Sequence, residues 1–512
     1  MEERMKDYGR ANEELRLNES VKEQMRHKMA RRNVVRRNRR MVAIVCAVAM
    51  VAVLAVTGIL DGALASLGLS GTMNALAAAE YPKIDENKHL WKLNFREEQG
   101  TYSDELLEGI KKFARDTAGM VLGQETERNL CYSPVSLYTA LAMTAEMAGG
   151  ETRQQILEAL HYVYPDGVSS GKWTMREDEI PLPIHSLAED MYRYLTLTYE
   201  KEMTSATQIA NSLWINEDML SEKDLRQTTA DLLAEKYMVS TYVRDFAKKS
   251  TREDMSDWVI QHTKGLLGGR NGDFELGQET AMTLLSTVYY YDQWIDEFDK
   301  SRNVTAPFYK ADGTTVEAEY MCVTHNPHGV LAKEGFTAAG LGTKGSSQVT
   351  FILPDEGYTP ADILGNEEMM AEILAIGGEP EWEYAEVRFQ VPKFQFWSEM
   401  DLTDVVKQLG ILDAFSQNEA DFSGILKSEE SKEDSIQDAL STTGSSIWLS
   451  GIRQQTTISV DEKGVEASAY IELQYAGAAM PQDRIIEFTL DRPFIILVEN
   501  GGPLFIGVIQ QP

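Results

Sequence analysis

The sequence predicts an α+β fold in which helices dominate the first part of the globular region and strands dominate the last third. Apolar residues recur every three or four positions, the spacing of one helix face, through 104–120, 134–148, 151–160 and 221–238. Runs rich in β-branched and aromatic residues, typical of strands, occur at Val387–Val391, Thr456–Val460, Ile485–Leu490, Phe494–Val498 and Leu504–Val508. Helices that precede most of the strands, rather than alternating with them, favour an α+β arrangement.

The helix predicted at 134–148 has the clearest start. Pro134 would occupy its first turn, where a helix needs no backbone N–H, and Ser133 precedes it. Two stretches without periodicity, 161–185 and the acidic, Ser-rich 427–446, are predicted to be insertions, the second a surface loop. From about residue 100 to residue 512 we expect one globular domain.

Composition limits the class of protein. The 512 residues are 43% hydrophobic, enough for a large core. The three cysteines, Cys46, Cys131 and Cys322, have no metal-ligand spacing and exclude a disulfide framework. Stability must therefore come from packing.

Charge divides the chain in two. Residues 1–40 hold 13 basic and 7 acidic residues, whereas the remainder holds 36 basic and 73 acidic residues. An acidic body of this kind repels nucleic acid, because binding requires neutralisation of phosphates. The excess of acidic residues after residue 40 is explained as surface charge that keeps an exported domain soluble.

An uncharged apolar run spans residues 41–60, long enough at about 1.5 Å per residue to cross a bilayer. The arginines before it predict a cytoplasmic tail at 1–40 and an external chain after residue 60. The ALAAA stretch at 75–79 leaves open a cleaved signal peptide and a secreted protein. We therefore expect an anchor or signal at 41–60 and a linker at 61–99.

Seven ordered stretches carry a family resemblance. They are Asn129–Gln155, Ile209–Ile215, Leu284–Phe298 with the later Pro307-Phe308 and Met321, Val391–Phe394, the pair Leu409–Phe415 and Ala420–Gly424, Val460–Ala469, and the closing Asp491–Phe494 and Leu504–Pro512. Together they resemble the serpins, a family of serine protease inhibitors, over residues 100–512. Within that family the chain resembles a microbial-type member, membrane-anchored or secreted.

The resemblance implies a large, mostly antiparallel central sheet, smaller sheets and an exposed reactive-centre loop at about 462–490. A serpin of the inhibitory kind is attacked as a substrate, and the cut loop then inserts into the central sheet with the protease still attached. The chain would be no enzyme itself. Its partner would be a serine protease held in a covalent acyl complex, and a monomer is expected.

The loop sequence suits insertion as a strand. Val465, Ala467, Ala469, Ile471, Leu473 and Tyr475 alternate with a mostly polar set, so one face could meet the core and the other solvent. Pro481 is the first proline after the hinge, so no ladder donor is missing before it. Alternation alone equally fits an ordinary edge strand. The resemblance assigns the hinge to Glu462, Lys463, Gly464, Val465, Glu466, Ala467, Ser468 and Ala469.

Family spacing from the hinge places the scissile bond between Ala478 and Ala479. Counting back from Asp491 places it later, near Gln482, so the window is Tyr475, Ala476, Gly477, Ala478, Ala479, Met480, Pro481 and Gln482. Small residues around this bond suit an elastase-like protease.

The family's sheet-opening region corresponds here to Ser133, Ser136, Ser286, Trp294 and Gln454. Where the family commonly has a His and an Asn, this chain has Gln454 and Ser286, which can hydrogen-bond each other. Neither titrates near neutral pH, so we expect opening to depend less on pH.

Val465, where the family prefers Thr or Ser, and the bulky Tyr470 leave open a non-inhibitory serpin, a binding protein or one cleaved without trapping. No hydrolase or nucleotide-binding motif occurs. Pro327 between His325 and His328 argues for a loop rather than a metal site. We expect no catalytic residues, cofactor or metal.

Overall fold

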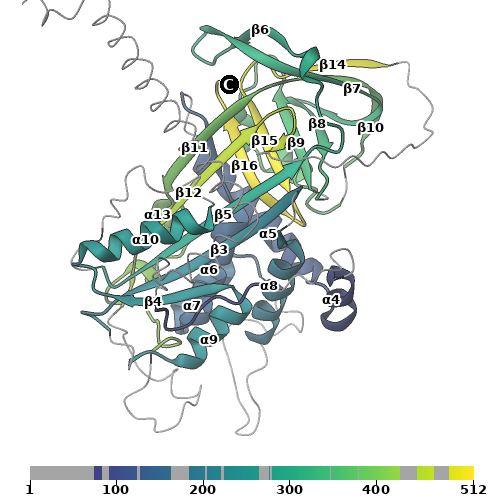
Figure 1. Ribbon diagram of the computed structural model, residues 1–512. Coiled ribbons are helices and arrows are strands. Elements are labelled where there is room, and N and C mark those ends of the chain that lie inside the picture. The colour runs from purple at the N-terminus through teal and green to yellow at the C-terminus, as the bar shows by residue number, and fades with distance from the viewer. Residues whose placement is uncertain are drawn as a thin grey trace, which may run out of the picture. The chain divides into compact units, whose positions relative to one another are not determined.

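The computed structural model describes residues 74–82, 91–123, 127–162, 184–201, 204–220, 224–263, 276, 280–345, 347–378, 380–426, 447–465 and 484–512. Ala75–Pro512 form a compact unit (Figure 1). The predicted tail at 1–40 and apolar segment at 41–60 lie outside the described residues. Within the described ranges, no helix has the length and apolar character needed to cross a membrane.

The unit contains helices and two large sheets. The helices are α4 (Trp91–Gln99), α5 (Asp104–Leu122), α6 (Pro134–Met147), α7 (Gly150–Ala159), α8 (Ile184–Thr198), α9 (Gln227–Lys236), α10 (Lys249–His262), α11 (Pro360–Leu364), α12 (Glu367–Ile373) and α13 (Thr403–Gln408), with 3₁₀ turns η2 (Lys300–Arg302) and η3 (Asp413–Phe415). The strands are β1 (Leu130–Tyr132), β2 (Glu200–Lys201), β3 (Ser205–Asn216), β4 (Val239–Arg244), β5 (Met282–Gln293), β6 (Val304–Tyr309), β7 (Thr315–Lys333), β8 (Phe336–Gly342), β9 (Gln348–Pro354), β10 (Glu383–Pro392), β11 (Phe394–Asp401), β12 (Leu449–Val460), β13 (Gly464–Val465), β14 (Ile485–Thr489), β15 (Phe494–Glu499) and β16 (Pro503–Ile509).

Capping residues explain two helix starts. The Ser103 hydroxyl accepts a hydrogen bond from the Leu106 N–H at 3.1 Å, which begins α5. At α6, Ser133 caps the Ser136 N–H in the same way and Pro134 occupies the first turn. The start predicted from Ser133-Pro134 is therefore confirmed.

The helix predicted at 221–238 begins later, at Gln227. Two contacts with a distant segment hold the preceding chain extended. Leu225 forms a β-bridge with Leu426, and the Arg226 N–H donates to the Ile425 carbonyl at 2.8 Å. Tertiary pairing thus overrides the helical periodicity of residues 224–226.

The seven-stranded sheet has the order β11-β12-β13-β5-β3-β2, and β4 pairs with β3. We call it the central sheet. Most of its pairs are antiparallel, but β12 with β5 and β3 with β4 are parallel, so the sheet is mixed. Figure 1 shows β3, β5, β11 and β12 crossing the unit together, with α10 beside them.

The second sheet has nine strands and does not match the smaller sheets that we predicted. Its order is β1-β16-β15-β9-β8-β7-β10-β14, and β6 also pairs with β7. The 19-residue β7 pairs with β6 over residues 315–320, with β10 over 320–330 and with β8 over 330–333. One continuous strand therefore joins what would otherwise be two smaller sheets.

The helix α6 lies inside the core. All 14 of its residues are buried, which matches its lack of a polar face. It packs against β5 of the central sheet and β16 of the second sheet. The N-terminal end of α6 is consequently fixed between the two sheets, where the candidate site is found.

Residues 75–82 belong to this compact unit although they fall within the predicted linker at 61–99. The Leu76 N–H donates to the Thr241 carbonyl at 2.7 Å, and the Thr241 N–H donates to the Ala77 carbonyl at 2.9 Å. Ala77 is buried against Ala230 and Ala234 of α9. This stretch pairs with the free side of β4, at the margin of the central sheet.

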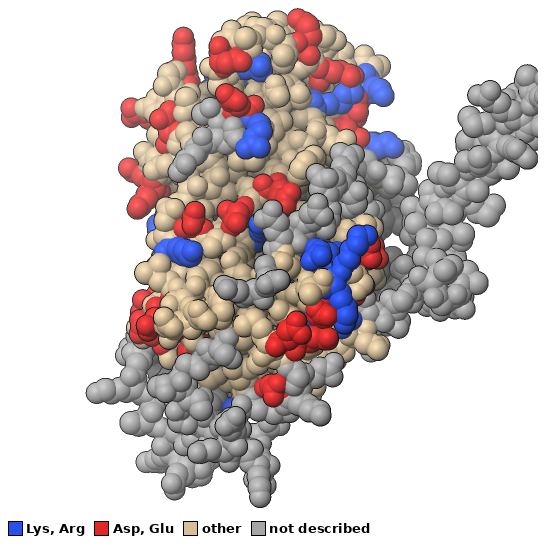
Figure 2. All heavy atoms as spheres, turned by 90° about the vertical axis from the view of Figure 1, so that its left-hand side faces the viewer, with Lys and Arg blue, Asp and Glu red and all other residues tan. Residues whose placement is uncertain are grey.

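On one face of the protein, the described acidic side chains are spread out rather than gathered (Figure 2). Figure 2 shows acidic side chains along the length of one face, with basic side chains among them. This face therefore offers no single basic surface for a polyanion.

Candidate functional site

The hinge enters the central sheet as a two-residue strand. Within β13, Val465 pairs with Val460 of β12 on one side and with Asp292 of β5 on the other. Val465 is only 1% exposed. The first residues of the hinge are therefore already seated between β5 and β12.

Gly464 is required by the close approach of β5. A Cβ atom at this position would lie 2.1 Å from the Asp292 carbonyl oxygen, which no side chain tolerates. The turn before it is closed by Asp461, whose side chain accepts from the Lys463 N–H at 2.9 Å. Glu462 accepts from Lys393 Nζ at 3.1 Å, so the hinge turn is tied to the end of β10.

Trp294 lies directly against this turn. Its indole N–H donates to the Asp461 carbonyl at 2.9 Å, and its backbone N–H donates to the Lys463 carbonyl at 2.9 Å. The Trp294 side chain is 1% exposed and packs edge-on against Phe298. Trp294 is therefore both a core residue and a contact of the hinge turn.

Below the hinge, β5 and β12 separate. They pair directly at their lower ends, where Ser286 lies opposite Gln454. Between that pair and β13, residues 287–291 and 455–459 are described, and no β5–β12 pairing occurs among them. We call this five-residue gap the slot.

The lower end of the slot is closed by a polar network at the start of α6. Gln454 accepts from the Ser133 N–H at 2.8 Å and donates to the Ser133 carbonyl at 3.1 Å. The Ser136 hydroxyl contacts the Ser286 hydroxyl at 2.5 Å, and Ser286 donates to Asn211 Oδ1 at 2.7 Å. The structure thus brings together four of the residues singled out from the sequence.

The pairing of partners differs from the one we expected. Gln454 and Ser286 lie opposite each other, but each bonds to a different part of α6, and Ser286 also bonds to β3. Sequence reasoning missed Asn211, which joins β3 to the network. The sequence did carry a signal for Asn211, which is an amide within the mostly apolar run IANSLWI. A polar side chain that is buried in such a run needs a hydrogen-bond partner.

We expect Gln454→Ala to lower the thermal unfolding midpoint by several degrees. The change leaves the buried Ser133 N–H without its acceptor, at a cost of about 2 kcal/mol. Calorimetry would measure it, with Gln455→Ala, on the less buried side of the same strand, as the control. Equal midpoints for the two variants would contradict a role for Gln454 in closing the slot.

Asp292, opposite Val465, is a second buried polar group that the sequence did not reveal. Its carboxylate accepts from the Thr343 hydroxyl at 2.6 Å and from the Gly345 N–H at 2.9 Å. Burial raises the pKa of Asp292 to about 7, and the negative charge of the nearby Glu200 adds to the rise. The two hydrogen bonds lower the pKa, but by less than burial raises it. A titratable group therefore lies beside the hinge, although Gln454 supplies none.

We expect Asp292→Asn to have a pH-dependent effect on stability. Because the folded pKa lies above the ordinary value of 3.8, the native carboxyl keeps a proton that the unfolded one releases. The wild-type stability contributed by this group therefore falls as pH rises from about 4 through about 7. Relative to wild type, Asp292→Asn should gain on the order of 2 kcal/mol between pH 5 and pH 8.

Chemical unfolding at several pH values would measure this difference. The control is Asp296→Asn, because the Asp296 side chain is 66% exposed. A difference between Asp292→Asn and wild type that stays constant with pH would contradict the raised pKa.

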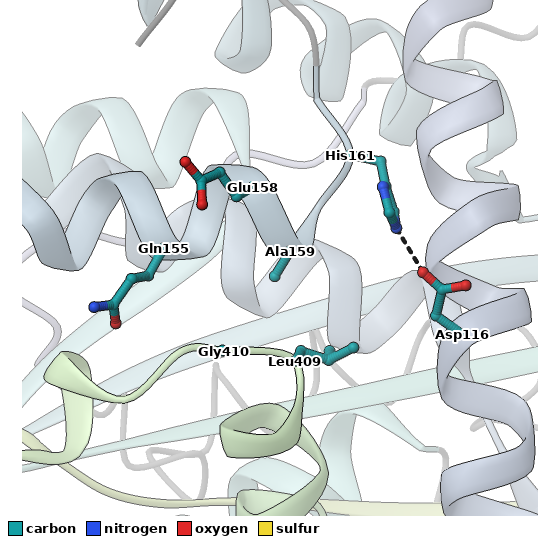
Figure 3. A pocket seen from close by; sticks show the side chains of 7 residues that line it. All are labelled: Asp116, Gln155, Glu158, Ala159, His161, Leu409 and Gly410. Carbon is teal, nitrogen blue, oxygen red and sulfur yellow. Dashed lines mark hydrogen bonds and ion pairs between the residues drawn. The ribbon is translucent and has the colours of Figure 1, made fainter. Parts of the chain in front are cut away.

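A separate hollow of about 200 Å³ lies between α5, α7 and the end of α13 (Figure 3). His161 points toward Asp116 and contacts its carboxylate at 2.6 Å, while Gln155 accepts from the Leu412 N–H at 2.9 Å. These contacts join structural elements, and the residues that line the hollow include no Ser, Thr, Cys or Lys. Within the described ranges, no cluster of three or more His, Cys, Asp or Glu is arranged to hold a metal.

The remaining predicted residues lie outside the described part of the chain. They are Glu466, Ala467, Ser468 and Ala469 of the hinge, and the whole window from Tyr475 to Gln482.

Comparisons with known proteins agree with this architecture. A family model described as Serpin (serine protease inhibitor) matches residues 108–512. Plasminogen activator inhibitor 1 of Neovison vison is 27% identical over 420 residues, covering 79% of this chain and 91% of that protein.

Two solved structures share the fold. A thermophilic serpin, tengpin, in its native state has a TM-score of 0.63 at 23% identity, covering 85% of this chain and 97% of that chain. Human thyroxine-binding globulin has a TM-score of 0.62 at 22% identity, covering 80% of this chain and 99% of that chain.

Proposed function

The chain belongs to the serpin family, and on that premise we propose that it is a suicide inhibitor of extracellular serine proteases. The observation that carries the proposal is β13, seated between β5 and β12 at the head of the slot. A sheet in which two strands are not paired with each other, and whose gap is entered by the start of the expected reactive-centre loop, is what trapping by strand insertion requires.

The register of β13 predicts how insertion would proceed. Continued residue by residue, it would bring Ala467 opposite Ile458 and Tyr290, and Ala469 opposite Thr456 and Val288. All four partners are buried. The odd-numbered loop residues would therefore face the core, as the alternation in the sequence predicts.

Insertion would have two stages. Residues 466–470 match the slot in length and would meet no existing pairing. From Ile471 onward the strand would have to separate Ser286 from Gln454, and then the pairs below them. The polar network at α6 would thus set the energy required for the second stage.

Trapping is a competition between insertion and hydrolysis. The protease serine attacks the carbonyl of the residue before the cut, forming an ester and releasing the C-terminal part of the loop as an amine. Insertion then moves the ester-linked protease away from the loop's original position. If insertion precedes water attack on the ester, the protease stays bound; if not, it is released and the inhibitor is spent.

Specificity rests on the loop sequence. We propose Ala478–Ala479 as the cleaved bond and an elastase-like target with a shallow pocket for a small side chain. The window contains no Lys or Arg, which disfavours a trypsin-like target.

For location, we propose a single-pass protein held in the cell membrane by residues 41–60, with the serpin domain outside and monomeric. The charge-free length of that run and the preceding arginines support this. Cleavage near 75–79 would give a secreted form. Alkaline extraction of membranes, followed by mass spectrometry of the N-terminus, separates the two forms.

The test of inhibition is to incubate the full chain with pancreatic elastase and analyse it by denaturing gels and mass spectrometry. We expect a covalent complex and a released peptide that begins at Ala479. Clean cleavage with full protease activity would instead support a non-inhibitory serpin. No cleavage would exclude elastase-like specificity.

A further inference from the structure

We infer that an exposed apolar surface next to the reactive-centre loop is a secondary docking site for the target protease. The surface consists of Trp382, Tyr384 and Ile485, which we call the rim patch. Their side chains are 38%, 61% and 51% exposed. The inference rests on the proposed function and names a further determinant of its specificity.

The rim patch is built on paired strands. β14 pairs in parallel with β10, so that Ile485 lies opposite Glu386. Tyr384 is two residues before Glu386, so its side chain is on the same face of β10. Trp382 packs over Gly329 of β7, and a Cβ atom there would lie 3.6 Å from the indole ring. Figure 1 shows β14 at the margin of the sheet beside β7 and β10.

The charged groups around the patch are paired, two arginines with three glutamates. Arg388 bonds to Glu487 at 2.8 Å and to Glu386 at 3.0 Å, and Arg484 pairs with Glu383. These ion pairs link β10 to β14 and to the residue preceding it. They occupy the charged groups beside the patch, so that its exposed surface consists mainly of the two aromatic rings and the Ile485 side chain. A partner with a nonpolar surface loop would therefore fit here better than a charged one.

Proximity to the loop identifies the partner. Ile485 follows Gln482, the last residue of the cleavage window, by three residues, which span at most about 10 Å of extended chain. From Ala479 the distance is at most about 20 Å. The Glu386 N–H donates to the Arg484 carbonyl at 2.8 Å, so the described end of the loop is fixed at the patch.

A serine protease cannot bind the window without overhanging this surface. A domain of about 220 residues has a radius of gyration of about 17 Å, and hence a width of about 40 Å. The part of the protease nearest the patch is the surface beside the pockets for residues that follow the cut. Exposed Trp and Tyr side chains placed there are among the types that dominate binding energy at interfaces, and Ile485 adds apolar area beside them.

The test measures association and trapping separately in the full chain. We expect Tyr384→Ala combined with Ile485→Ala to lower the second-order rate of elastase inactivation by about tenfold. The number of inhibitor molecules consumed per protease should stay unchanged, because the patch takes no part in insertion. Binding to elastase whose catalytic serine is replaced by alanine should weaken by the same factor.

The control variant is Trp397→Ala, which removes a 55% exposed aromatic from β11 in the central sheet. Association rates of the double variant within twofold of wild type, or an equal loss in Trp397→Ala, would overturn the inference. If wild type forms no covalent complex, the proposed function itself fails. If wild type forms the complex and the patch variant traps at the same rate, only the inference about the patch fails.

A change in oligomeric state provides the remaining outcome. If light scattering shows that the double variant dissociates a wild-type dimer, the patch joins copies of this chain and the protease assignment is wrong. A monomer in both cases, together with slower association, supports it.

Discussion

Ala467→Arg should turn the protein from an inhibitor into a substrate. In the inserted strand this residue would lie opposite Ile458 and Tyr290, both buried on the core side of the central sheet. A guanidinium there would have no partner and would lose its hydration, which costs several kcal/mol. Insertion would slow while ester hydrolysis continued, so the inhibitor consumed per protease should rise by about 100-fold.

The matched control is Glu466→Arg, one residue earlier on the opposite face of the strand. Continued pairing would place it opposite Ser459 and Tyr291, on the side where wild type already carries a charge. Titration of elastase with each variant measures the stoichiometry. Similar stoichiometry for Ala467→Arg and Glu466→Arg would show that the register of β13 does not continue into the slot.

Val465→Glu should abolish trapping by a different route. Val465 is buried between β5 and β12, and its partner Asp292 is itself a buried carboxyl. A second carboxylate would be desolvated beside the first, so the pairing of β13 should be lost and re-entry of the hinge disfavoured. We expect no covalent complex with elastase, and each cut inhibitor molecule should be released as a spent substrate.

Val465→Thr is the conservative control, because it keeps the branched shape and adds one hydroxyl. It should retain most trapping activity. A denaturing gel of each variant with elastase, and limited digestion of the hinge by an unrelated protease, would follow both effects. A normal covalent complex with Val465→Glu would mean that the seating of Val465 contributes little to insertion.

Local features of the site could be predicted from the sequence. The N-terminal end of α6 follows from Ser133 and Pro134, because capping depends on adjacent residues. There the governing interaction lies within a few residues along the chain. The two-residue alternation after Val465 falls outside the described residues and stays a prediction.

Features set by distant partners could not be predicted. The burial of Asp292 depends on Thr343 and Gly345, which approach it from the turn between β8 and β9. Gln454 bonds to Ser133 rather than to Ser286 because α6 lies against the slot. The strand β13 has only two residues, too few to show the alternation that predicts a strand. It forms because β5 and β12 are far enough apart there for a strand to pair with both.

The pairing of residues 76–77 with β4 has a consequence for the behaviour of the protein at high concentration. A sheet that must remain able to accept a strand is open to strands from neighbouring molecules, and unpaired margins are where such exchange begins. Here the chain covers the free side of β4 with its own backbone, through Leu76 and Ala77. When molecules are crowded together, strands of neighbouring molecules therefore cannot pair with this side of β4. The slot between β5 and β12 is left for the molecule's own loop.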